Sequence, residues 1–374
     1  MRGTRTGRKS RCGWIAVRVL VSVLVFSLLT WPMVGGVKAA VAGSNTTFSG
    51  EATALSVKSP LLPFDPVLGT NEIRLGYTQK YPAGSPAFQD EASFFNADLN
   101  QYGVPLTAEV GHASTFGSGN QSRSEASLAN FNLVAEGYTI SASFLMARGK
   151  ATCGSASSVS GQSHIADLVI NGQHITITGE PNQTIQLPLG TVVINEQSGD
   201  SNNINVTALH IVITNVVEVA VASVHADITC GATPDCPGQH AFVTSGGYIL
   251  NLNGEKAHFA VAGRNLSNWG HILYRDGNVH IKNPYAVVYR TLADLKNDPK
   301  SKMFNVPNNL ENSKFEGAAI LTETDTTGNS GVSVLVIDMG EPGRGVDYFE
   351  ILGVAAAGGG FLEGGNIQMH GKCQ

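Results

Sequence analysis

The positions of the cysteines constrain the fold of this chain more than any other feature. One of the five, Cys12, lies in a basic and apolar leader, and the other four are spread over the rest of the sequence. Four cysteines allow three pairings. If each cysteine pairs with its neighbour along the chain, the two disulfides close two consecutive segments. These pairs are Cys153 with Cys230 and Cys236 with Cys373. We therefore expect two disulfides, each holding together one domain of its own.

A metal site would be the alternative use of the same cysteines. Structural zinc sites commonly use a Cys-x-x-Cys pair, and no such pair occurs in this chain. Disulfides, in contrast, form and persist in oxidising compartments such as the extracellular space. The cysteine pattern thus favours a protein that works outside the cytoplasm.

The first 42 residues have the three parts of a signal peptide: a basic start, an apolar middle and an exit of small residues. The basic start runs from Arg2 to Arg18, the apolar stretch covers Val19–Leu29, and Ala39 and Ala42 offer cleavage sites. We predict cleavage of residues 1–42 and a secreted, extracellular or cell-surface location. An uncleaved anchor helix is the alternative, although the apolar stretch is short for a span of about 20 residues.

The charge balance argues against nucleic acid as a partner. Seven of the 24 basic residues and none of the 29 acidic residues lie in the leader, so 17 basic residues remain and the net charge becomes −12. Nucleic-acid binding depends on Lys and Arg that neutralise phosphates. We therefore expect no nucleic-acid partner and no affinity for anionic membranes.

The composition beyond the leader indicates short strands and many turns. About 330 residues are more than one ordinary hydrophobic core needs, so we expect two domains. The first would cover residues 43–230, with prolines making residues 43–110 an irregular lead-in that contributes only edge strands. A linker over residues 231–238 and a second domain over residues 239–374 would follow.

From Tyr138 onward, segments rich in Val, Ile and Thr and bounded by Gly, Asn and Pro predict strands in both domains. Asn171-Gly172 fits a two-residue type I′ hairpin, and Asn253-Gly254 joins two further predicted strands. Only Thr291–Asn297 is predicted as helix. The fold class is therefore all-β, with two β-sandwich-like or partly closed barrel domains, each closed by one disulfide.

Several segments of the first domain resemble the choice-of-anchor P family of bacterial secreted proteins. They follow the family order over roughly Glu109 to Cys230: Leu168–Gly172, Ile185–Pro188, Val192–Gln197, Val206–His210 and Val219–Ser223. The resemblance implies a module that precedes varied C-terminal surface anchors. It supplies no catalytic residue to carry over.

The second block resembles the small domain that follows this module in some family members, through Val336–Phe349 and Gly364–His370. The anchored members continue into a C-terminal transmembrane helix, a basic tail or a sorting motif, which this sequence lacks. We therefore expect no stable membrane anchor once the leader is cleaved.

An acidic turn is one candidate site. Asp338, Glu341 and Asp347 surround Gly340–Gly343 and could supply oxygens to Ca²⁺, which takes six to eight oxygen ligands. The alternative is that Arg344 ties the turn down by pairing with Asp338 or Asp347. The second interpretation is favoured because a cation beside the carboxylates opposes metal binding.

Aromatic and histidine residues give two more candidates. Trp269, Tyr274, Tyr285 and Tyr289 would face a sugar ligand if exposed, or would fill the core if buried. The second domain also has three histidines on consecutive predicted strands that could converge on zinc, although strand alternation would scatter them: His258, His271 and His280.

These observations predict a secreted, non-enzymatic protein with a structural, adhesive or ligand-binding role at a surface, with an extracellular glycan or a surface protein as partner. No Gly-x-Ser-x-Gly elbow or Gly-rich phosphate loop is present, and we expect no cofactor. Two alternatives stay open. One is a polysaccharide-active hydrolase, since paired carboxylates need no local motif. The other is an interaction module stabilised by Ca²⁺.

Overall fold

The computed structural model describes residues 45–63, 71–231, 241–276, 278–308, 310, 314–324, 330–353 and 357–371. These belong to one compact unit, Gly43–Gln374. The predicted signal peptide, residues 232–240 of the linker region and the expected pair Cys236–Cys373 lie outside the described residues. The described fold is almost entirely antiparallel β-sheet, as predicted.

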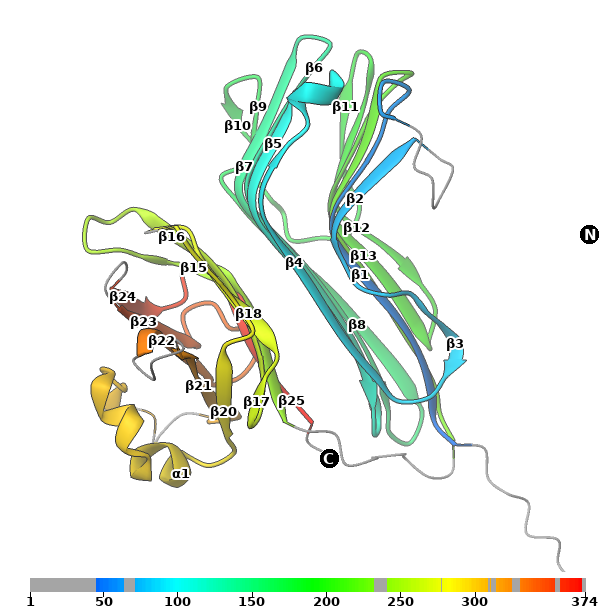
Figure 1. Ribbon diagram of the computed structural model, residues 1–374. Coiled ribbons are helices and arrows are strands. Elements are labelled where there is room, and N and C mark those ends of the chain that lie inside the picture. The colour runs from blue at the N-terminus through cyan, green and yellow to red at the C-terminus, as the bar shows by residue number, and fades with distance from the viewer. Residues whose placement is uncertain are drawn as a thin grey trace, which may run out of the picture. The chain divides into compact units, whose positions relative to one another are not determined.

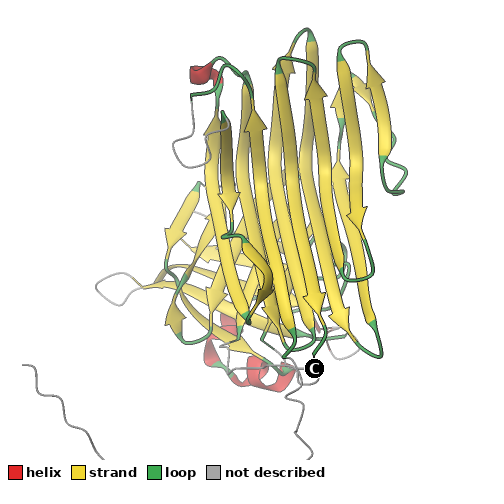
Figure 2. Cartoon of the chain, turned by 90° about the vertical axis from the view of Figure 1, so that its right-hand side faces the viewer, coloured by secondary structure: helices red, strands yellow, loops and turns green. Residues whose placement is uncertain are grey.

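The strands before residue 232 form two seven-stranded sheets, which face one another in Figure 1 and contain the long strands of Figure 2. Sheet I has the order β11 (Gln183–Leu187), β12 (Gly190–Gly199), β13 (Asn203–Ile213), β14 (Val217–Thr229), β1 (Thr47–Lys58) and β2 (Glu72–Tyr77), with β3 (Tyr81–Ser85) also paired to β1. Sheet II has the order β10 (Gln173–His174), β9 (Val169–Ile170), β7 (Tyr138–Cys153), β6 (Gln121–Ala135), β5 (Leu106–Ser118) and β4 (Phe88–Asp98), with β8 (Ser157–Ala166) also paired to β7.

Alternating apolar side chains of sheets I and II meet in one hydrophobic cluster. Leu55 and Leu209 of sheet I and Leu128 and Leu145 of sheet II are fully buried in it. Side chains two residues apart on a strand share a face, so each strand contributes a row of such residues. This is a β-sandwich, and among the described strands neither sheet closes on itself.

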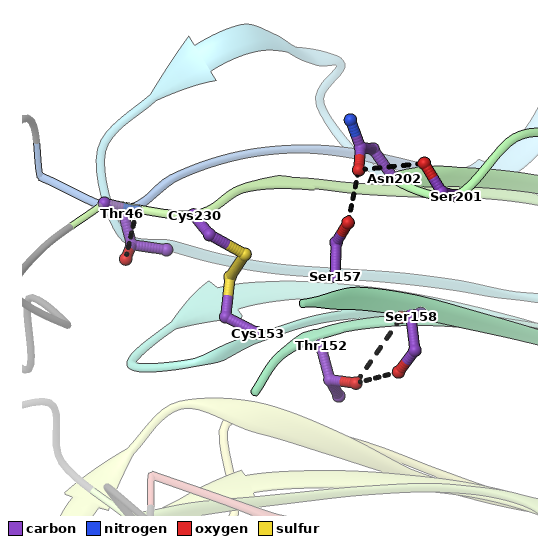
Figure 3. Close-up of a disulfide and its surroundings, with 9 residues drawn as sticks. Thr46, Thr152, Cys153, Ser157, Ser158, Ser201, Asn202 and Cys230 are labelled. Carbon is purple, nitrogen blue, oxygen red and sulfur yellow. Dashed lines mark hydrogen bonds between the residues drawn. A yellow bond between two sulfur atoms is a disulfide. The ribbon is translucent and has the colours of Figure 1, made fainter. Parts of the chain in front are cut away.

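The expected disulfide Cys153–Cys230 is present (Figure 3). Cys153 ends β7 in sheet II, and Cys230 directly follows β14 in sheet I, with 5.7 Å between their Cα atoms. The bond therefore joins the two sheets of the sandwich to each other at one end of these strands.

The expectation of an irregular lead-in over residues 43–110 is wrong. β1 is a central strand of sheet I between β14 and β2, and β4 and β5 are long members of sheet II. Several prolines mark strand boundaries instead: Pro60 follows β1, Pro86 separates β3 from β4, and Pro105 precedes β5, whereas Pro82 lies within the short strand β3. Proline removes a backbone donor, so it is tolerated where a strand ends.

The strands after residue 240 form two further sheets. Sheet III has the order β19 (Val279–Lys282), β18 (Gly270–Tyr274), β16 (Lys256–Arg264), β15 (Phe242–Leu250) and β25 (Gly364–His370). Sheet IV has the order β17 (Ser267–Asn268), β20 (Tyr285–Tyr289), β21 (Gly317–Thr324), β22 (Ser330–Asp338), β23 (Tyr348–Gly353) and β24 (Gly358–Phe361). Their core contains Phe259 stacked on Phe349 with 4.0 Å between ring centroids.

Helical segments are few and short in the described chain: η1 (Asn100–Tyr102), α1 (Leu292–Asn297) and η2 (Pro299–Met303). The prediction of a helix over Thr291–Asn297 is confirmed, since the Thr291 side chain caps α1 by accepting a hydrogen bond from the backbone N–H of Asp294. Within the described residues, no helix combines the length and apolar character that a membrane span requires.

Sheet II and sheet III are in contact, and we call this contact the interhalf interface. Part of it is apolar: Val110 and Ala129 of sheet II cluster with Ala260 and Leu273 of sheet III. Aromatic contacts also cross it, from Phe116 to Phe242 and from Phe144 to Tyr248.

Buried polar side chains meet at the same contact, among them Glu125 with Asn366. Strands β5 and β15 are accordingly buried on both faces over most of their length. Polar groups buried at such a contact need hydrogen-bond or ionic partners. The interhalf interface is therefore a candidate location for a functional site.

Candidate functional site

Four charged side chains lie together at the interhalf interface on neighbouring strands of sheet II. Arg123 and Glu125 lie two residues apart on β6 and therefore share a face. On β7, Lys150 lies opposite Arg123 and Arg148 lies opposite Glu125. The strand register thus places three cations and one carboxylate in a single patch.

The turn after β22 covers this patch from the second half of the chain. Its Glu341 forms an ion pair with Arg148, and Arg148 Nη2 donates a hydrogen bond of 2.9 Å to Gln162 Oε1 on β8. A cavity of about 190 Å³ remains between the turn and sheet II. Its lining consists of Arg123, Ser124, Glu125, Arg148, Gly149, Lys150, Ser160, Gln162, Glu341 and Gln368.

Glu125 is the most perturbed acid of this cavity. Its side chain is almost fully buried, and Oε2 accepts a hydrogen bond of 3.0 Å from Asn366 Nδ2 on β25. Burial raises the pKa of Glu125 to about 7, although Arg148 and Asn366 act in the opposite direction. Near neutral pH this carboxyl group is therefore only partly ionised.

A second groove, of about 450 Å³, adjoins the first and shares Arg148 and Gln162 with it. Its lining is rich in amides and small polar groups, with Arg344 as its other cation: Met146, Arg148, Gly161, Gln162, Ser163, His164, Gly179, Pro181, Asn195, Gln197, Pro342, Arg344 and Gly365. Burial, followed by nearby cations, lowers the pKa of His164 to about 4. His164 is therefore neutral at pH 7.

Three cations of these two cavities have no ion-pair partner among the described residues: Arg123, Lys150 and Arg344. Arg123 also buries its Nε without a hydrogen-bond partner in the described chain. Burial lowers the pKa of Arg123 and of Lys150, and the charge of Glu316 acts in the opposite direction on both. The combined site therefore has unused capacity to bind an anion.

The expectation that Arg344 pairs with Asp338 or Asp347 is wrong. The two aspartates accept backbone N–H groups instead: Asp338 those of Gly340 and Met369, and Asp347 those of Met339 and Ile367, at 2.8–3.0 Å. Two backbone donors would be left unsatisfied if either carboxylate turned toward Arg344. Arg344 is exposed and faces the second groove.

The calcium candidates Asp338, Glu341 and Asp347 are accordingly engaged by other groups. Burial raises the pKa of Asp338 to about 6 and that of Asp347 well above its usual value, the latter also through repulsion by Asp338. Groups held in this way are poor ligands for Ca²⁺, which requires ionised carboxylates with free lone pairs. The calcium hypothesis remains a prediction that is open to experiment.

The four aromatic candidates do not share one exposed face. Tyr274 is fully buried in the core between sheets III and IV, and Tyr289 is buried with its hydroxyl donating to Asp298 Oδ2 at 2.7 Å. Trp269 and Tyr285 are partly exposed, under Arg264 and near Lys300 respectively. The expectation that these four could face a ligand together is wrong, because β18 and β20 belong to different sheets.

The histidines of the second half also separate. His280 is exposed and stacks on Phe95, while His258 lies near Phe144 and Tyr248. His271 instead reaches across the interhalf interface to Glu91 of β4 and His112 of β5. The strands that hold this group are labelled β4, β5 and β18 in Figure 1.

Neither the charged cluster on β6 and β7 nor the group of Glu91, His112 and His271 was predicted from the sequence. Charged residues at alternating positions, Arg123 with Glu125 and Arg148 with Lys150, are a usable signal once β6 and β7 are known, because a buried strand rarely carries charges without a reason. No local signal connects Glu91, His112 and His271, which are far apart in sequence.

No protein-family model, no curated protein and no solved structure gives a match to this chain.

Proposed function

We propose that the protein is an extracytoplasmic, non-enzymatic binding protein whose ligand is an acidic glycan. The ligand would lie in the two adjoining grooves at the interhalf interface. The observation that carries this proposal is the set of cations without ion-pair partners among the described residues, Arg123, Lys150 and Arg344, in an otherwise acidic protein.

An anionic ligand fits the charge balance of the site. The carboxylates that line the grooves are Glu125, which is partly neutral at pH 7, and Glu341, which is already paired with Arg148. Arg344 has no carboxylate partner in the described lining, whereas Arg123 and Lys150 share a neighbouring pocket with Glu316, whose charge attracts both. Arginine presents a planar fork of donors that matches a carboxylate, so a uronic acid group is a suitable partner for Arg344.

A saccharide fits the neutral part of the lining. Ser160 and Ser163 line the grooves with hydroxyls. Four amides line them as well, and each uses part of its hydrogen-bonding capacity within the chain: Gln162, Asn195, Gln197 and Gln368. Sugar hydroxyl groups, like amides, can both donate and accept hydrogen bonds. A phosphate ligand would make less use of so many neutral amides, which is why we favour a carboxylated sugar.

Secretion is part of the same proposal. The Cys153–Cys230 bond is of the kind that persists in an oxidising compartment, and the leader has the parts of a signal peptide. The resemblance to the choice-of-anchor P family supports a role at or near a cell surface. A periplasmic or extracellular fraction containing the chain without residues 1–42 is the expected result of expression in a bacterial host.

A glycan array probed with the purified protein tests the binding role. We expect selective retention of uronic-acid-containing glycans, at least tenfold weaker for Arg344→Gln, since charge-assisted hydrogen bonds contribute about 1.5–3 kcal/mol each. Lys282→Gln, which removes an exposed cation on β19 away from the grooves, is the matched control and should bind like the wild type. Equal binding by Arg344→Gln would contradict the assignment.

A hydrolase is the second candidate, because two carboxylates contact one nitrogen. Asn366 Nδ2 lies 3.0 Å from Glu125 Oε2 and 3.3 Å from Glu341 Oε1. Glycosidases use such a pair, with one carboxyl of raised pKa as the acid. Release of reducing sugar ends from an acidic polysaccharide, abolished in Glu125→Gln, would favour the hydrolase, whereas binding without turnover favours the proposed binding role.

A further inference from the structure

We propose that Glu91, His112 and His271 bind one divalent transition-metal ion, Zn²⁺ by preference, and that this ion fastens the two halves of the chain together. The site is separate from the anion-binding grooves. None of its three residues lines either of the two cavities.

The three side chains already converge. Glu91 on β4 and His112 on β5 are diagonal neighbours in sheet II, because Glu91 lies opposite Ser114 and Ser93 lies opposite His112. Glu91 Oε1 lies 3.0 Å from Nδ1 of His271 on β18 and 3.7 Å from Nδ1 of His112.

The spacing of the three groups suits one ion. One ligand atom from each residue lies within 4.8 Å of the other two. Nitrogen and oxygen ligands at 2.0–2.2 Å from a tetrahedral zinc are about 3.3 Å apart, so small side-chain movements complete the site.

The histidines lack other partners. His112 is fully buried, yet neither of its ring nitrogens has a hydrogen-bond partner in the described chain, and the same is true of His271 Nε2. Buried polar groups are nearly always satisfied, so an imidazole with two unpartnered nitrogens calls for an explanation. A metal ion between His112, His271 and Glu91 supplies one.

The ligand set selects the kind of metal. Two imidazoles and one carboxylate suit Zn²⁺ and similar first-row ions, whereas Ca²⁺ and Mg²⁺ prefer oxygen ligands alone. Glu91 and His271, like His112, are almost fully shielded from solvent, so at most a small fourth ligand such as water could join them. The shielding of the ligands from solvent indicates that the metal ion has a structural rather than a catalytic role.

The ion would cross-link the interhalf interface. Two ligands come from sheet II in the first half, and the third comes from sheet III in the second half. Binding that requires all three ligands stabilises only the assembled arrangement, by mass action. Removing the metal should therefore loosen the two halves from one another.

The test uses the full chain after treatment with a chelator and dialysis. Calorimetric titration with Zn²⁺ alone should give one ion per chain with submicromolar affinity and a raised melting temperature. Glu91→Gln and His271→Gln should each weaken binding at least tenfold. His280→Gln, an exposed histidine on the neighbouring strand β19, is the matched control and should bind zinc like the wild type.

Two controls keep the result interpretable. Co²⁺ added to the wild-type chain should give the intense visible absorption of a four- or five-coordinate site, which does not depend on any variant folding correctly. Arg344→Gln should retain full zinc affinity, so the glycan and metal proposals can fail separately. The proposal is overturned by a wild-type chain that binds no stoichiometric zinc, by a weak six-coordinate Co²⁺ spectrum, or by folded Glu91→Gln that binds as tightly as the wild type.

Discussion

Asn366 of β25 donates a hydrogen bond of 3.0 Å to Glu125 of β6, and both side chains are buried where the two halves of the chain meet. The contact links residues 241 positions apart in sequence. The hydrogen bond from Asn366 satisfies one carboxyl oxygen of Glu125, Oε2. The other oxygen, Oε1, is buried and has no hydrogen-bond donor among the described residues. The titration of Glu125 should therefore affect stability.

Glu125→Gln should change how stability depends on pH. Because the pKa of Glu125 is raised to about 7 in the folded state, the folded chain holds its proton more tightly than the unfolded chain, and this group makes stability fall as pH rises from about 4.5 to 7. Glutamine removes that loss. The free energy of unfolding of the variant, relative to wild type, should rise by on the order of 2–3 kcal/mol between pH 4.5 and pH 8.

Urea unfolding of the wild type and of Glu125→Gln at several pH values gives the difference between their free energies of unfolding. Other titrating groups contribute equally to both proteins, so their contributions cancel in this difference. Glu180→Gln, at an exposed loop position, is the control and should follow wild type. A Glu125→Gln difference that stays constant with pH would show that Glu125 titrates normally.

Asp347→Ala should be strongly destabilising. Asp347 is fully buried and accepts the backbone N–H groups of Met339 and Ile367 at 2.9 and 2.8 Å. Alanine leaves both donors buried without an acceptor, at a cost of about 2–5 kcal/mol. Glu180→Ala should stay within about 0.5 kcal/mol of wild type in the same denaturant series. A similarly small effect at Asp347 would mean that the turn is held by other contacts.

Removal of the Cys153–Cys230 bond should lower stability without abolishing the fold. The two cysteines are 77 residues apart, so the chain-entropy description gives about 4 kcal/mol for closing this segment. Thermal melts of the Cys153→Ser, Cys230→Ser double variant test this value. Melting curves that coincide with those of the wild type would contradict it.

A peptide map under non-reducing conditions would also test the Cys236–Cys373 pair, which lies outside the described residues. We predict two disulfide-linked peptide pairs, one containing Cys153 and Cys230 and the other containing Cys236 and Cys373. A bridge that joins Cys236 to Cys153 or Cys230 would contradict the expected division into two separately closed segments.

Calcium should leave the melting temperature unchanged. The oxygens of Asp338 and Asp347 already accept backbone donors, and Glu341 is paired with Arg148. Ca²⁺ would have to displace these bonds to gain its ligands. Melts of the metal-free chain with and without millimolar Ca²⁺ are the measurement, and a clear rise in melting temperature would restore the calcium hypothesis.

The parts of the fold that sequence predicted are those decided by neighbouring residues. Asn171 and Gly172 both have positive φ between β9 and β10, as the predicted hairpin requires, and Thr291 caps the one predicted helix. Residues 43–110 are not the irregular lead-in that their prolines predict, because several of these prolines stand where strands end.

The site was largely beyond sequence reasoning because it depends on how sheets face one another. Strand alternation says that Arg123 and Glu125 share a face, but which surface covers that face is decided by contacts between distant segments. The same holds for Glu91 and His271, which meet only because sheet III lies on sheet II.

A crystal structure of the chain with an acidic oligosaccharide bound is the most direct test of the central claim. Our account predicts sugar in the grooves between sheet II and the turn after β22, with a ligand carboxylate within hydrogen-bond distance of Arg344 or Lys150. Ligand bound elsewhere on the surface, with both grooves filled only by solvent, would contradict it.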